Sequence, residues 1–167
     1  MDLILVRHAI AGERDSRRWP DDRERPLTKD GIARFEQAAA GLRNVVGSVD
    51  LVLASPYRRA WQTAEILEKV AGWPAPVACT ELEPENRAET VIERCNQERA
   101  GVIALVGHEP LLGELAGRLL AGPDAPPQPL KKGGTACFRT NNDIVSEGDS
   151  TLRWWLPPKV LRRLGSS

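Results

Sequence analysis

Long apolar runs, an excess of one sign of charge and paired cysteines are all missing from this chain of 167 residues. No apolar run approaches the ~20 residues that cross a bilayer, which argues against a membrane span. Lys plus Arg and Asp plus Glu number 23 each, so no net positive charge attracts nucleic acid or an anionic membrane. Three cysteines without a CxxC pair predict neither a disulfide framework nor a zinc site. We therefore expect a cytoplasmic protein with reduced thiols and no metal.

Short apolar runs alternate with segments whose apolar residues recur every three or four positions, which is typical of βαβ units. We expect strands at 3–6, 51–54, 77–79, 102–106, 135–140 and 151–156, the last two as a ribbon at a sheet edge. Three helices are expected from their start signals: one after Thr28 as N-cap, one after Ser55 with Pro56 at the first helical position, and one after Asn86 in a capping box with Glu89. Two more are expected over 112–119 and from Pro157 to Leu164. The length fits one α/β domain over residues 1–167.

Both histidines of the chain directly follow strands of this predicted sheet. His8 comes after the run that ends at Val6 and Arg7, and His108 comes after the run that ends at Gly107. Because functional groups gather at the carboxyl ends of strands in an open α/β sheet, the two imidazoles can meet in one crevice. An anion site with an imidazole nucleophile is one interpretation. The alternative is a structural salt bridge of Arg7 and a histidine that caps the sheet.

Arginines near helix starts are the second signal. Arg58 and Arg59 fall in the first turn of a predicted helix, where the helix dipole disfavours cations. They can pair with acids such as Asp50 or Glu85, as surface arginines commonly do, or help the helix N–H groups to hold a phosphoryl group. We favour Arg59 for that second role because it adjoins the buried helix face. Arg25 lies in a loop rich in both charges, where a solvated surface is the usual explanation.

Four motifs together give a family resemblance. They are Arg7-His8-Ala9, Arg25-Pro-Leu-Thr-Lys-Asp-Gly31, Ser55-Pro-Tyr-Arg-Arg-Ala-Trp-Gln-Thr-Ala64 and Gly107-His-Glu-Pro110. In this order and spacing the chain resembles the histidine phosphatase, or phosphoglycerate-mutase-like, superfamily from residue 2 to about residue 156, and is most similar to its small SixA-type phosphohistidine phosphatase branch. The resemblance implies a three-layer αβα sandwich with a mostly parallel central sheet and no large inserted cap.

The resemblance also implies roles for the matching residues. His8 would be the nucleophile that takes the phosphoryl group, and Arg7, Arg59 and His108 would hold its oxygens, joined by Arg25. Thr28 and Glu109 are the other substrate-binding candidates, and Glu109 is expected to help keep His108 protonated. Phosphoryl transfer asks mainly for positioning and positive charge, so no metal or other cofactor is expected.

The general acid is the weakest match to the family pattern. Members with mutase-like sites donate a glutamate from an inserted segment, whereas the stretch from Thr80 to Asn86 is short here. Glu81 lies near the corresponding place and is our candidate, with Glu83, Glu85 and Asp22 as rivals. The missing insertion would leave the pocket open to a phosphohistidine carried on a protein. Imidazole is also a good leaving group that needs little protonation.

Three functions remain open from the sequence. The first is a phosphatase for a histidine-phosphorylated protein domain. The second is a phosphatase for a small or generic phosphoester, with the same catalytic groups and different pocket walls. The third is a phosphate-binding adaptor without catalysis, which ranks last because His8, Arg7, Arg59 and His108 are all present.

Overall fold

A computed structural model describes residues 1–142 and 144–166. Within them a six-stranded sheet has the order β3-β2-β4-β1-β5-β6. The strands are β1 (Asp2–Arg7), β2 (Leu51–Ala54), β3 (Val77–Ala78), β4 (Val102–Gly107), β5 (Thr135–Thr140) and β6 (Ser150–Leu156). β1 to β4 run parallel, and β5 and β6 are antiparallel additions. The predicted α/β class with a mostly parallel sheet is confirmed.

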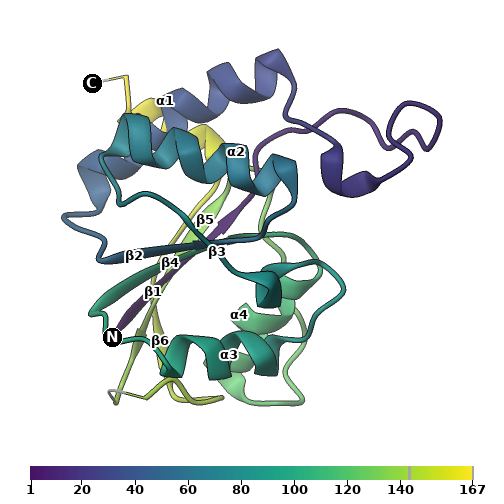
Figure 1. The fold of residues 1–167 in the computed structure, drawn as a ribbon. Helices are drawn as coiled ribbons and strands as arrows, with labels where there is room; N and C mark the ends of the chain where they lie inside the picture. Colours follow the sequence, from purple (N-terminus) through teal and green to yellow (C-terminus); the bar gives the residue numbers. More distant parts are fainter. Residues whose placement is uncertain (143, 167) are drawn as a thin grey trace.

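Helices cover both faces of the sheet and form the outer layers of a three-layer sandwich (Figure 1). One face carries α1 (Lys29–Val45), α2 (Arg58–Ile66) and α5 (Pro158–Leu164), and the other carries α3 (Ala88–Asn96) and α4 (Leu111–Ala121). A π-helical turn, η2 (Leu67–Ala71), extends α2, and two short 3-10 turns are η1 (Asp22–Glu24) and η3 (Thr80–Leu82). Among the described residues no helix has both the length and the apolar character to cross a bilayer.

The central strands are buried on both faces, which explains their uninterrupted apolar sequence. In β1 the side chains of Ile4 and Val6 join the core under α1 and α2, while those of Leu3 and Leu5 join the core on the α3–α4 face. β4 alternates in the same way. A short apolar run can therefore be placed in the middle of the sheet from sequence alone.

Helix caps follow the sequence in one case and depart from it in two. Thr28 caps α1, because its Oγ1 accepts from the Gly31 N–H at 2.9 Å. α2 begins at Arg58, with Tyr57 instead of Ser55 at its N-cap, and the Ser55 hydroxyl contacts His108 at 2.9 Å while accepting only a long bond from the Tyr57 N–H at 3.4 Å. α3 begins at Ala88, and Asn86 donates its side-chain amide to the Thr80 carbonyl instead of forming the expected capping box. The expected ribbon at a sheet edge is confirmed, because β5 and β6 pair antiparallel at one side of the sheet and β5 joins them to β1.

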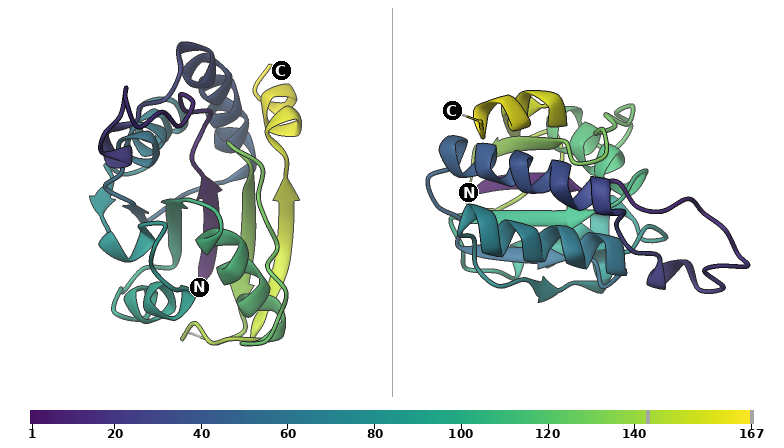
Figure 2. Two further views of the ribbon diagram at one scale, coloured as in Figure 1. Left: turned by 90° about the vertical axis from the view of Figure 1, so that its right-hand side faces the viewer. Right: turned by 90° about the horizontal axis from the view of Figure 1, so that it is seen from above.

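The connection between β1 and α1 makes a long excursion beyond the carboxyl ends of the parallel strands (Figures 1 and 2). An isolated bridge between Ala11 and Leu27 closes its base, together with a bond from the Gly12 N–H to the Pro26 carbonyl at 3.0 Å. The excursion contains η1, and Arg25 follows η1 directly. It therefore brings charged residues from a distant loop to the edge of the sheet where β1 ends.

The contact between α1 and α5 depends on a glycine. A Cβ placed on Gly41 would collide with the carbonyl oxygen of Leu161, whereas one on Gly47 would meet no atom within 4 Å. We expect Gly41→Ala to lower the free energy of unfolding by about 1–3 kcal/mol, because the backbone of one helix would have to move. Chemical denaturation measures this, with Gly47→Ala as the control of unchanged stability. Equal stabilities of the two variants would contradict the packing described here.

Candidate active site

The two histidines meet because β1 and β4 are parallel neighbours in the sheet. Arg7 is paired with Gly107 in this register, and the backbone N–H of His8 donates to the Gly107 carbonyl at 3.0 Å. The centroids of the His8 and His108 rings are 5.1 Å apart. Residues one hundred positions apart in the chain thus face one another at the carboxyl edge of the sheet.

His8 is held in one tautomer by the backbone. Its Nδ1 lies 2.7 Å from the Ala9 carbonyl oxygen, and since a carbonyl can only accept, the proton is on Nδ1. Nε2 then carries the lone pair. Burial, together with the positive charges of Arg59 and Arg7, lowers the pKa of His8 to about 3 in spite of that hydrogen bond. The imidazole is therefore neutral at ordinary pH, as a nucleophile must be.

His108 is more deeply buried and is also neutral. Its Nε2 is 2.9 Å from the Ser55 hydroxyl, its ring packs edge-on against Tyr57, and its Nδ1 has no hydrogen-bond partner in the described part of the chain. Burial, together with the positive charges of Arg59, Arg25 and Arg7, lowers the pKa of His108 to about 2. The protonated state expected from the sequence would thus need a bound anion to offset the cost of burial.

Glu109 was expected to help keep His108 protonated, but its carboxylate is bound to backbone groups instead. Its two carboxylate oxygens accept from the backbone N–H groups of Leu130, at 2.8 Å, and Gly113, at 3.2 Å. The Leu130 carbonyl in turn accepts from Nη1 of Arg7 at 2.6 Å. Glu109 therefore braces the segment that orients Arg7.

Three arginines reach the same space from three parts of the chain. Arg7 ends β1, Arg25 follows η1, and Arg59 lies in the first turn of α2. Arg59 is 4% exposed, whereas Arg58 is exposed on the surface. The Nε atoms of Arg7 and Arg59 are buried without a hydrogen-bond partner among the described residues. Such groups are rare in folded proteins, and an anion with several oxygens would satisfy them.

Asp22 is the carboxylate at the centre of this positive cluster. It lies 2.8 Å from Nε of Arg25 and 3.1 Å from Nη1 of Arg59, with Nε of Arg14 at 3.9 Å. Burial raises its pKa, but the hydrogen bond from Arg25 and the charge of Arg59 outweigh that effect, so the pKa is lowered and Asp22 is ionised. The carboxylate thus neutralises guanidiniums that a phosphoryl group would otherwise contact.

These groups line an open pocket of about 330 Å³. Its walls include six of the eight residues that the sequence indicated: Arg7, His8, Arg25, Arg59, His108 and Glu109. The rest of the lining consists of Arg14, Asp22, Pro84, Glu85, Pro110 and Lys132. Within the described residues, no group of three or more His, Cys, Asp or Glu side chains is arranged to hold a metal ion.

Thr28 and Glu81 do not line the pocket. The Thr28 hydroxyl is engaged as the cap of α1 and donates to the Ile10 carbonyl at 3.3 Å. Glu81 accepts from the Cys79 thiol at 3.3 Å, because the 3-10 turn η3 directs its carboxylate toward its own neighbours. Glu85, a rival candidate for the acid, does line the pocket, and it accepts from the Tyr57 hydroxyl at 2.8 Å.

Ser55, Tyr57 and Lys132 are site residues that the sequence analysis missed. Ser55 directly follows β2, so the reasoning that selected the two histidines could also have found it. Tyr57 packs against His108, and its ring also lies 4.9 Å from the guanidinium carbon of Arg59. Lys132 sits in the turn before β5, a position without any periodic signal.

Comparisons with known proteins identify the family of this chain. The family model for the histidine phosphatase superfamily (branch 1) matches residues 3–83. An uncharacterized protein of Picosynechococcus sp. is 34% identical over 165 residues, which cover 96% of this chain and 99% of the relative. The chain belongs to the histidine phosphatase superfamily. As a member of this superfamily it is a phosphatase, and it binds phosphorylated substrates.

Named phosphatases are similar to this chain in sequence or in fold. Phosphohistidine phosphatase SixA of Escherichia coli is 25% identical over 166 residues, 97% of each chain. A structure of the protein histidine phosphatase SixA complexed with tungstate superimposes with a TM-score of 0.81 at 24% identity, over 95% of this chain and 98% of the other. The structure of a phosphoserine phosphatase mutant from Entamoeba histolytica in complex with phosphoserine superimposes with a TM-score of 0.68 at 16% identity, over 96% of this chain and 98% of the other.

The negative charge of Asp22 is expected to weaken the binding of anions in the pocket. We expect Asp22→Asn to bind inorganic phosphate or vanadate roughly 3- to 10-fold more tightly at pH 7, because a repulsion of about 1 kcal/mol is removed. Isothermal titration calorimetry measures this. Asp30→Asn removes the same charge from an exposed ion pair with Arg34 and serves as the control. Weaker binding by Asp22→Asn would mean that Asp22 mainly positions the arginines.

The histidine protonation states are also testable, because the chain has only two histidines. An ordinary histidine gains its proton near pH 6.5, whereas a lowered pKa delays protonation to more acidic conditions. We expect NMR signals of both rings to stay those of neutral imidazole from about pH 8 down to about pH 5. His8→Asn and His108→Asn assign the signals. A ring that titrates near its ordinary pKa in the free protein would contradict the burial described.

Proposed function

We propose that this phosphatase removes phosphate from protein phosphohistidine, with His8 as nucleophile and a phosphohistidine enzyme intermediate. The observation that carries the proposal is the hydrogen bond from Nδ1 of His8 to the Ala9 carbonyl. It leaves a neutral Nε2 beside Arg7, Arg59 and His108, which all line the same pocket.

The first step transfers the phosphoryl group to the enzyme. Nε2 of His8 attacks phosphorus, an N–P bond forms on the enzyme, and the N–P bond of the substrate breaks. The leaving imidazole takes the electron pair of that bond. Charge on the phosphoryl oxygens is stabilised by the guanidiniums of Arg7, Arg25 and Arg59, and Nδ1 of His108 supplies a further hydrogen bond. The positive charge thus comes from side chains, which supports a metal-independent reaction.

The second step is hydrolysis of the intermediate. Water attacks the phosphorus on His8, inorganic phosphate leaves, and Nε2 of His8 recovers its lone pair. Asp22 and Glu85 line the pocket and are the carboxylates available to accept or deliver a proton. Since imidazole leaves easily, the lowered pKa of Asp22 fits a base for this water better than an acid for the substrate.

The short wall of the pocket supports a protein-borne substrate. Only nine residues, 79–87, connect β3 to α3, and they contribute Pro84 and Glu85 to the lining. No inserted cap is present in the described chain, so a phosphohistidine on the surface of another protein could reach His8. A small phosphoester is the second candidate, favoured by the likeness to a phosphoserine phosphatase.

Activity on a substrate panel tests the proposal. We expect the protein to hydrolyse a phosphohistidine protein with a higher kcat/KM than phosphoserine, a phosphotyrosine analogue or sugar phosphates, and to keep this activity in EDTA. His8→Asn should lower kcat by at least about 10³-fold, because it removes the nucleophile.

Three outcomes would contradict parts of this proposal. Turnover by His8→Asn would exclude the covalent mechanism, provided that circular dichroism shows the fold intact. Loss of activity in EDTA, with recovery on added metal, would exclude a metal-independent reaction. A preference for sugar phosphates or phosphoserine would favour the small-molecule alternative.

A further inference from the structure

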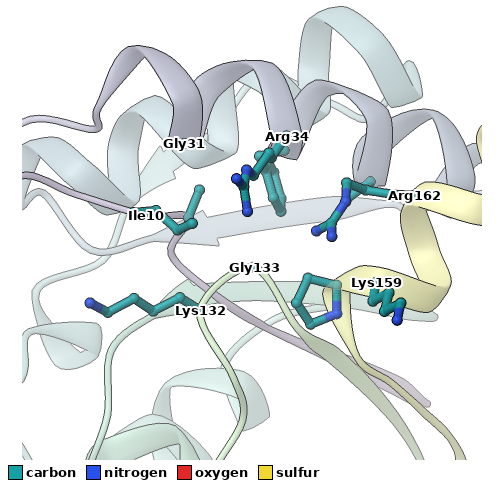
Figure 3. Close-up of a pocket in the computed structure, with 11 residues that line it drawn as sticks. Ile10, Gly31, Arg34, Lys132, Gly133, Lys159 and Arg162 are labelled. Carbon is teal, nitrogen blue, oxygen red and sulfur yellow. The ribbon is translucent and has the colours of Figure 1, made fainter.

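A second cavity lies next to the catalytic pocket and contributes nothing to the chemistry proposed above. It has a volume of about 190 Å³ and lies between α1, α5 and the turn that precedes β5 (Figure 3). Its floor is apolar and includes Ile10, Phe35 and Pro158. Its rim is basic and consists of Arg34, Lys132, Lys159 and Arg162.

Most of this positive charge has no acidic partner. Arg34 pairs with Asp30 at 2.8 Å, but Lys132, Lys159 and Arg162 form no ion pair with any carboxylate of the described residues. The whole chain has no net charge, so three unpaired cations around one cavity are a local excess. Figure 3 shows Arg34 and Arg162 pointing from α1 and α5 into the space between the two helices and Gly133.

The cavity and the catalytic pocket share part of their lining. Lys132 lines both. The next residue, Gly133, donates its N–H to the carbonyl oxygens of Arg7 and His8, at 3.1 Å each. Ile10 lies two positions after the nucleophile. A polypeptide that presents a phosphohistidine to His8 would therefore cross Lys132 and reach this cavity within a few residues.

We propose that this basic cavity docks an acidic segment of the phosphorylated protein substrate, which rests on the function proposed above. One apolar side chain of that segment would contact Phe35 and Pro158, and carboxylates beside it would pair with Lys159 and Arg162. The volume is below the ~300–1,000 Å³ of pockets that enclose a drug-sized ligand, which favours part of a polypeptide over a whole small molecule.

Two synthetic phosphohistidine peptides test the proposal. They differ only in the residues around the phosphohistidine, which are glutamates in one and glutamines in the other, and both carry the same leucine. We expect the wild-type protein to have a KM at least about fivefold lower for the glutamate peptide, with similar kcat. The preference should shrink at high ionic strength, because exposed ion pairs are screened by salt.

Two charge-reversal variants on α5 test whether the preference for the glutamate peptide arises in this cavity. Arg162→Glu is expected to abolish the preference for the glutamate peptide and to leave hydrolysis of p-nitrophenyl phosphate unchanged. Arg163→Glu reverses the neighbouring charge in the same last helical turn, outside the cavity, and should keep the preference. It controls for effects on stability and on net charge.

The outcomes separate this inference from the function on which it rests. If both peptides are hydrolysed with equal KM, or if both variants lose the preference equally, the docking site is excluded and the phosphohistidine activity stands. If neither peptide is hydrolysed while small phosphoesters are, the proposed function itself fails.

Discussion

The parallel pairing of β1 with β4 is the constraint on which the site depends. It places Arg7 beside Gly107, and the backbone bond from His8 to Gly107 continues that register by one residue. A slip of the register by one residue would turn buried side chains to the opposite face and separate the imidazoles. The apolar side chains of both strands, packed on both faces of the sheet, therefore fix the positions of the two imidazoles as well as the fold.

Burial then determines the protonation of the site. Both imidazoles are kept neutral by desolvation and by nearby guanidiniums, which cannot lose their own protons in this range. The resulting positive charge is only partly balanced by Asp22. An incoming phosphoryl group brings the missing negative charge, so substrate binding and the charge on His108 are coupled.

Features that depend on neighbouring residues in the sequence could be predicted. Features that depend on a distant partner or on the conformation of one turn could not. The strand at 51–54 and the cap at Thr28 are local, and the structure has both as expected. Ser55 was expected only as a helix cap, because its closer partner, His108, is distant in sequence. Glu81 and Glu85 are indistinguishable by composition, and only the 3-10 turn η3 decides which carboxylate reaches the pocket.

The closed base of the excursion between β1 and α1 has an evolutionary consequence. Arg25 and Asp22 are carried by this segment, yet the bridge between Ala11 and Leu27 ties it to the body of the protein. Lengthening or shortening the tip, residues 13–21, would reshape the entrance for substrate without disturbing a single strand. Diversification of selectivity among related proteins could therefore proceed through insertions at this tip while His8 and the strands stay in place.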